Sequence, residues 1–211
     1  MRKTLIVLLT LLLVASSIFA GERSKGYIGL SGGYQMEDKE IIHSVFSKKH
    51  DVESFALNID GAYFKKEGKS GYLFTASLLF PQKMKWDSGD VTDTYDYRSF
   101  GVEVLKAFRF EPMKNLYVDL GLGLGYELLI SDLKHDDDYD QYFNTVALAS
   151  KLAANYSFTE HFAVRAGLGM TIPFFTYYTS HYTGNGDHGD DTFDFMYGVT
   201  AQPFIGAAYT F

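Results

Sequence analysis

The sequence has no cysteine among its 211 residues. This absence excludes a disulfide framework, a thiolate metal site and a lipid anchor on an N-terminal cysteine. Basic residues are also few, because 19 Lys and Arg stand against 26 Asp and Glu and the formal net charge is −7. Such a chain lacks the electrostatic attraction that drives nucleic-acid binding, so we expect no nucleic-acid partner. We also expect no cofactor and no metal.

The N-terminus has the order of a secretory signal. Basic residues at Arg2 and Lys3 precede an apolar stretch from Leu5 to Ala20 that ends in small residues. This stretch is about sixteen residues long, which is short of the ~20 that a spanning helix needs. We therefore predict a cleavable signal peptide over residues 1–20 and a mature domain over residues 21–211.

Apolar residues recur at every second position through most of the mature chain, which is the period of a β-strand with two different faces. The segment Leu116 to Ile130 shows this most clearly, with Leu120, Leu122 and Leu124 on one face and Gly121 and Gly123 on the other. Large apolar residues on one face and small or charged ones on the other suit a barrel whose outside meets lipid. The pattern predicts an all-β fold, an eight-stranded antiparallel up-and-down transmembrane β-barrel, with strands near residues 26–34, 53–64, 70–80, 95–110, 116–130, 142–157, 162–173 and 195–211.

The connections between these strands alternate in length. Segments 65–69, 111–115 and 158–161 are short, whereas 35–52, 81–94, 131–141 and 175–194 are long and polar. Short periplasmic turns and long external loops follow this rule, so both ends of the barrel domain are expected in the periplasm. The 18 Phe and 16 Tyr gather near the strand ends, as two aromatic girdles at the water interfaces would require.

The last strand carries a recognisable ending. Apolar or aromatic residues alternate from Pro203 to Phe211, and the chain stops at Tyr209-Thr210-Phe211. Together with the eight strands, this ending resembles the small outer-membrane β-barrel family of the OmpX and OmpA transmembrane-domain type. The resemblance implies location in the cell outer membrane, contact with outer-membrane lipid and lipopolysaccharide, and recognition of Tyr209 and Phe211 as an insertion signal by the barrel-assembly machinery. A monomer is expected.

Five charged residues are expected to face the lumen near the short-turn end. A charge in a closed lumen is costly unless it is paired, so three acids and two bases are expected to form one network. This network either fills and rigidifies the barrel or gates a narrow pore. Its members are Asp60, Glu103, Asp119, Lys151 and Arg165.

Lys106 breaks the alternation, because it falls on the row that faces lipid. Its stem could reach toward the interface, or a bulge could shift the phase of the strand.

The long loops contain acidic clusters, among them His135 to Asp140 and His181 to Asp191. They do not match the spacing of an EF-hand, and such runs are usually a solvated surface. Ser180 and His181 are the one pair that suggests a hydrolase, but adjacent residues of a strand point to opposite faces. We therefore expect a noncatalytic barrel whose acidic loops interact or adhere outside the cell and whose body is an envelope scaffold. A narrow channel for small or hydrophobic solutes is the alternative, and a lipid A-modifying enzyme ranks third.

Overall fold

The computed structural model describes residues 24–43, 46–65, 69–87, 89–92, 95–133, 136–182 and 188–211. The expected signal peptide, His135 and residues 183–187 of the loop clusters lie outside these ranges. Within the described part of the chain, no helix is long and apolar enough to cross a membrane.

Nearly every described residue belongs to a β-strand. Eight long strands and one short strand follow one another along the chain. Their bounds are β1 Ser24–His43, β2 Phe46–Lys65, β3 Ser70–Trp86, β4 Gly89–Asp90, β5 Tyr95–Met113, β6 Leu116–Leu133, β7 Asp136–Ser157, β8 Phe162–Tyr182 and β9 His188–Thr210.

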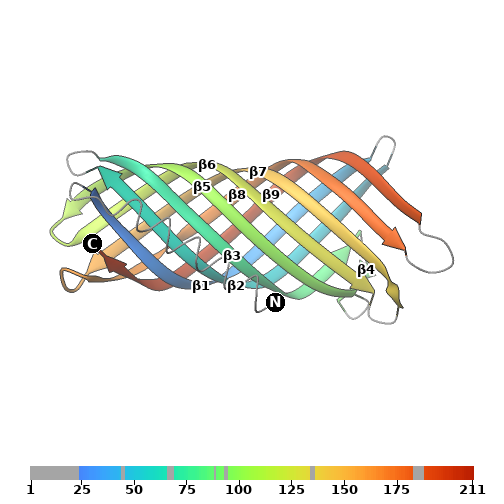
Figure 1. Ribbon diagram of the computed structural model, residues 1–211, viewed down its shortest axis with the longest axis horizontal. Helices are drawn as coiled ribbons and strands as arrows, with labels where there is room; N and C mark the ends of the chain where they lie inside the picture. Colours follow the sequence, from blue (N-terminus) through green and yellow to red (C-terminus); the bar gives the residue numbers. More distant parts are fainter. Residues whose placement is uncertain are drawn as a thin grey trace.

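The long strands close into an antiparallel barrel, as expected. Each pairs with its neighbour in sequence, apart from β4, which adds only to the end of β3. Pairing of β1 with β9 completes the ring. At this seam the main chains of Gly26 and Phe211 exchange two hydrogen bonds of 3.0 and 3.1 Å. Figure 1 shows the tilted strands, with the C-terminus at the end of the barrel opposite β4. The predicted fold class is therefore confirmed.

The prediction of long loops is wrong over much of their length, because paired strands occupy these segments. The β1–β2 ladder continues without interruption to the pair His43 and Phe46, and β8 and β9 pair as far as Tyr182 and His188. Beyond Tyr34, residues 35–43 add about 30 Å of strand at about 3.3 Å per residue. Polar residues occupy both faces there, so the alternation disappears from the sequence while the backbone ladder persists. The barrel wall therefore rises well beyond its apolar zone at this end, which we call the loop end.

All four prolines lie where a ladder is interrupted, because proline has no N–H to donate. Pro81 lies beside the register shift between β2 and β3, and Pro112 within the shift between β5 and β6. Pro173 lies in the stretch where β8 and β9 are unpaired, between Thr171 and Thr176. Pro203 lies where the β1–β9 pairing skips from Phe204 to Ala201.

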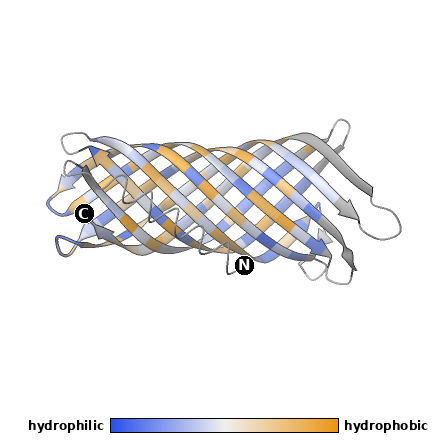
Figure 2. Cartoon of the chain, in the orientation of Figure 1, coloured by the Kyte–Doolittle hydropathy of each residue, from blue (hydrophilic) through white to orange (hydrophobic). Residues whose placement is uncertain are grey.

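The outer surface of the barrel is apolar around its middle. Leu122, Leu124 and Ile205 are 57%, 55% and 71% exposed, whereas Asp119 and Arg165 inside are 0% and 1% exposed. Figure 2 shows the apolar residues concentrated along the middle of the barrel and hydrophilic ones toward its ends. Exposed aromatic rings border this belt on the short-turn side (Tyr72, Phe108, Phe110, Tyr156, Phe158, Phe162, Tyr209, Phe211) and on the loop side (Phe55, Phe80, Tyr126, Phe174, Tyr197).

Candidate functional site

Among the described residues, the lumen is where charged side chains are brought together away from water. Inward-facing positions of the strands place three groups of charged side chains there, and we name each group by its position along the barrel axis. The turn-end pair consists of Arg109 and Asp119, the central network of Asp60, Lys151, Arg165 and Glu103, and the loop-end triad of Glu37, Lys39 and Glu127.

Asp60 is the centre of the central network. One of its carboxylate oxygens accepts a hydrogen bond of 2.8 Å from the Lys151 ammonium, and the other lies 3.2 Å from the Arg165 guanidinium. The hydroxyls of Ser31 and Thr75 donate to the same carboxylate at 2.7 and 3.0 Å. All four Asp60 contacts come from different strands, so this carboxylate ties together opposite walls of the barrel.

Glu103 is the outer member of the central network. Its carboxylate lies 3.9 Å from the Lys151 ammonium. The Lys151 ammonium also lies 4.9 Å from the centre of the Phe204 ring, and the Arg165 guanidinium lies 4.6 Å from that of Tyr27. The two bases are therefore held by carboxylates and by aromatic faces that carry partial negative charge.

Asp119 is not part of this network, which corrects the expected grouping. Its two oxygens accept hydrogen bonds of 2.6 and 2.8 Å from Arg109, and Asn155 donates to it at 3.0 Å. Arg109 and Asp119 are direct cross-strand partners of the β5–β6 hairpin. The alternation of side chains along β5 indicates this pair, because Arg109 lies two and four residues from the inward-facing Ala107 and Leu105 and therefore faces the lumen as well. The sequence reading missed Arg109 because it considered no base on that strand other than Lys106.

The loop-end triad was also missing from the expected lumen network. Lys39 bridges two carboxylates, at 2.6 Å from Glu37 and 3.0 Å from Glu127. Ser99 donates to Glu127 at 2.9 Å, and the Gln35 amide donates to Glu37. Glu37 and Lys39 were overlooked because residues 35–52 were expected to form a loop rather than inward-facing strand.

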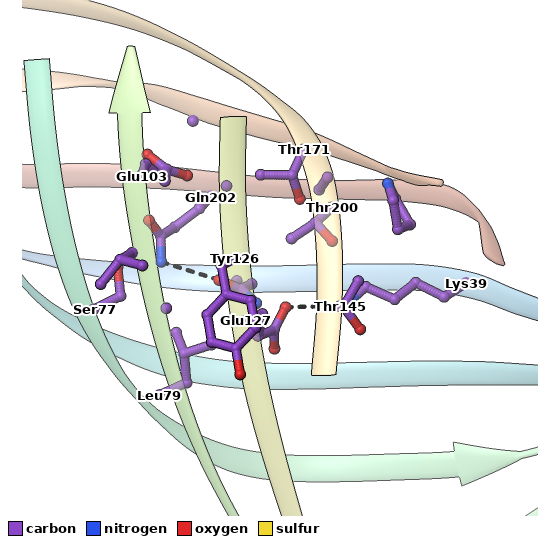
Figure 3. A pocket seen from close by; sticks show the side chains of 17 residues that line it. Lys39, Ser77, Leu79, Glu103, Tyr126, Glu127, Thr145, Thr171, Thr200 and Gln202 are labelled. Carbon is purple, nitrogen blue, oxygen red and sulfur yellow. Dashed lines mark hydrogen bonds and ion pairs between the residues drawn. The ribbon is translucent and has the colours of Figure 1, made fainter. Parts of the chain in front are cut away.

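A polar cavity separates the central network from the loop-end triad. Its empty volume is about 570 Å³, including space open to solvent, and Glu103, Glu127, Gln35, Gln202 and Thr200 are among its lining residues. Gln202 donates across the barrel to Gln35 at 3.2 Å. Figure 3 shows the labelled side chains of Glu103, Glu127 and Gln202 around this space.

Apolar side chains pack across the barrel on both sides of the cavity. Toward the loop end, the apolar plug is a buried cluster of Val52, Met84, Leu129 and Phe143. Toward the short turns, a second cluster includes Tyr27, Phe64, Leu73 and Leu105. The described part of the interior is thus a packed column of alternating apolar and ionic layers that contains a polar cavity.

Comparison with known proteins shows what this architecture resembles. No family model and no curated protein matches the sequence. Among solved structures, the outer membrane protein OprG from Pseudomonas aeruginosa has a TM-score of 0.60 at 16% identity, covering 90% of this chain and 98% of OprG. A major outer membrane protein from Thermus thermophilus has a TM-score of 0.57 at 12% identity, covering 89% and 99%. Neisserial surface protein A has a TM-score of 0.54 at 13% identity, covering 88% and 97%.

The chain has the fold of small outer-membrane β-barrels. Its apolar belt agrees with this likeness, because exposed Leu, Val, Ile and Phe around the whole circumference require lipid rather than water as their surroundings. Closed barrels leave no unpaired strand edge in the bilayer, and this is how β-proteins cross the bacterial outer membrane. The chain is located in the outer membrane, with its short turns on the periplasmic side by the rule for such barrels.

The residues of the expected insertion signal lie at the periplasmic end of this outer-membrane barrel. The Tyr209 ring stacks on His161 at 5.4 Å and meets Phe162 edge-on at 5.6 Å, so it belongs to the periplasmic girdle. Phe211 closes the seam through its main-chain hydrogen bonds to Gly26.

The backbone of the outer-membrane barrel separates the two residues of the suggested hydrolytic pair. Ser180 is opposite Gln141 and Asp190, and His181 is opposite Asp140 and Gly189, so the two residues belong to different rows of the sheet. The side chain of His181 lies outside the described part of the structure. Among the described residues, no group of three His, Asp or Glu side chains is placed to hold a metal ion.

Proposed function

We propose that this chain is a noncatalytic outer-membrane barrel that scaffolds the envelope and carries acidic loops on a raised wall for interaction or adhesion outside the cell. The observation that carries this proposal is the extension of the paired strands beyond the loop-side girdle. Pairing restricts the backbone of the residues that the wall carries, and this lowers the entropic cost of binding relative to an unpaired segment. The rows of acids along residues 136–140 and 188–194 give the wall its charge and favour a basic partner.

Binding of a basic probe tests the proposed role of the loops. Vesicles that contain the barrel are expected to bind an oligolysine peptide, with an affinity that falls as salt is added because exposed charges are screened. The triple variant Asp136→Asn, Asp137→Asn and Asp138→Asn is expected to weaken binding severalfold. The control removes three charges nearer the membrane, as Asp38→Asn, Asp51→Asn and Glu53→Gln. Equal loss in the two triple variants would show that total charge, and not the loops, attracts the probe.

A narrow channel is the second candidate, and the central cavity is the observation that favours it. The ionic and apolar layers on both sides of the cavity are expected to block the passage of solutes through the barrel. In planar bilayers we therefore expect negligible current from the parent protein and from Lys151→Ala, with folding of both checked by the gel shift on heating. A steady current that changes when Lys151 is removed would instead assign the central network to a gate.

We also infer that Tyr209 and Phe211 serve as the insertion signal. Support comes from the resemblance of the final strand to that of the outer-membrane family and from the position of both residues at the closing seam. Contact with outer-membrane lipid and lipopolysaccharide and a monomeric state complete the proposal.

A further inference from the structure

Lys106 is an exposed charge within the apolar belt. It lies on β5 with its side chain outside the barrel, opposite Tyr72 of β3 and Leu122 of β6. The β5 ladder with β6 is regular from Tyr95 to Phe110, so the alternative of a bulge that shifts the strand's phase is wrong. The outward neighbours Val104 and Phe108 are apolar.

The ammonium of Lys106 lacks a carboxylate partner within the described part of the chain. Its one recorded contact is with the face of the Tyr72 ring, 4.6 Å from the ring centre. Along the strand, Glu111 lies five residues away and beyond Phe110, which is about 16 Å at about 3.3 Å per residue. A base on the lipid face is costly at the midplane and less so near the interface, so a counter-charge from the bilayer would be stabilising.

The contact with Tyr72 sets the depth of this charge. Tyr72, Phe108 and Phe110 belong to the short-turn girdle, and the Lys106 stem leads its ammonium toward that girdle. The ammonium therefore lies at the level of the short-turn girdle, where the headgroup region of the bilayer begins.

We propose that Lys106 and Tyr72 form a binding site for an anionic glycerophospholipid of the periplasmic leaflet. The lipid phosphate would accept a hydrogen bond from the Lys106 ammonium, and the acyl chains would cover the apolar residues around it. This inference does not depend on the role of the extracellular loops.

The choice of occupant follows from depth and charge. Lipopolysaccharide belongs to the outer leaflet, on the loop side of the belt, and cannot reach the short-turn girdle. A zwitterionic phospholipid offers the same phosphate but also a cationic group, which the Lys106 ammonium would repel. A lipid with net negative charge is therefore the partner that fits this lysine.

Native mass spectrometry of the folded barrel, released from an equal mixture of phosphatidylglycerol and phosphatidylcholine, tests the site. The parent is expected to retain phosphatidylglycerol preferentially, and Lys106→Gln to lower this preference about fivefold, as expected for one lysine at a charged lipid surface. The matched control is Lys114→Gln, which removes the same charge from an exposed turn lysine. It is expected to keep the preference of the parent.

Two results would overturn the proposal. A Lys106→Gln barrel that keeps the full preference for phosphatidylglycerol would show that the lysine does not hold the lipid. An equal loss in Lys114→Gln would show only a diffuse attraction to the positive turns. Because Lys106 points out of the barrel, its replacement leaves the interior intact, and the gel shift on heating verifies that each variant is folded.

Discussion

Replacing Asp60 with asparagine is expected to lower the free energy of unfolding by about 3–5 kcal/mol, because two buried cations then lose their shared counter-charge. Lys151 and Arg165 are 2% and 1% exposed, so water cannot replace the carboxylate. Asparagine keeps the size of the side chain and can still bond Ser31 or Thr75. The lost unfolding free energy therefore reports the removal of the negative charge and not the creation of a cavity. Urea titration of the barrel in lipid vesicles, followed by circular dichroism, gives the value.

Two further variants separate this effect from a general effect of charge. Asp51→Asn removes a carboxylate that lies 3.5 Å from the exposed Lys49 and is expected to change stability little. The double variant Asp60→Asn with Lys151→Met is expected to recover part of the loss, since it restores equal numbers of acids and bases in the central network. If Asp60→Asn unfolded at the same urea concentration as the parent, the central network would be unimportant for stability.

The strands within the apolar belt could be predicted because lipid imposes a two-residue period on them. Leu120, Leu122 and Leu124 face lipid, and Gly121 and Gly123 face the interior, as the alternation indicated. Above the belt this constraint ends, since the outer face meets water and the inner face carries buried polar residues such as Gln35, Glu37 and Lys39. Hydrogen-bond pairing still continues there, and nothing in the residue pattern of 35–43 distinguishes a strand from a loop.

The ionic groups of the lumen were harder to predict than the strands, for a related reason. The alternation along a strand shows which side chains point inward. Which of them meet depends on the relative heights of strands that are far apart in sequence. Lys151 and Asp60 meet across the barrel, and no local pattern reports their common height. Arg109 and Asp119 belong to one hairpin, so their pairing could have been derived from the turn at residues 114–115. Lys39 could not, because its strand was expected to end before it.

The ionic layers of the lumen differ in how completely they are paired. The turn-end pair and the central network hold equal numbers of acids and bases, whereas the loop-end triad holds two carboxylates against Lys39. Balanced charges deep in the barrel reduce the cost of burial, and the excess acid lies toward the end that meets the outside. The excess acid of the interior therefore lies in the loop-end triad, near the apolar plug, on the side of the barrel that carries the raised wall.

Replacing Arg109 with alanine is expected to cost about 3–5 kcal/mol of unfolding free energy, because it leaves Asp119 buried with only the Asn155 amide as a partner. The guanidinium also lies 3.8 Å from the centre of the Phe64 ring, so its removal takes away a second contact in the same layer. Arg109→Lys is expected to restore only part of the loss, since an ammonium cannot bond both carboxylate oxygens and cover a ring.

The matched control for Arg109 is Arg98→Ala on the same strand. Arg98 is paired with Asp132 at 3.6 Å, but its side chain is 68% exposed, so its removal is expected to change stability little. Both variants are compared with the parent by the same urea titration. Equal losses of stability in the two variants would mean that removing any arginine from β5 destabilises the barrel, whether or not it is buried. A large loss of stability confined to Arg109→Ala would show that Arg109 offsets the cost of burying the Asp119 carboxylate at the periplasmic end of the lumen.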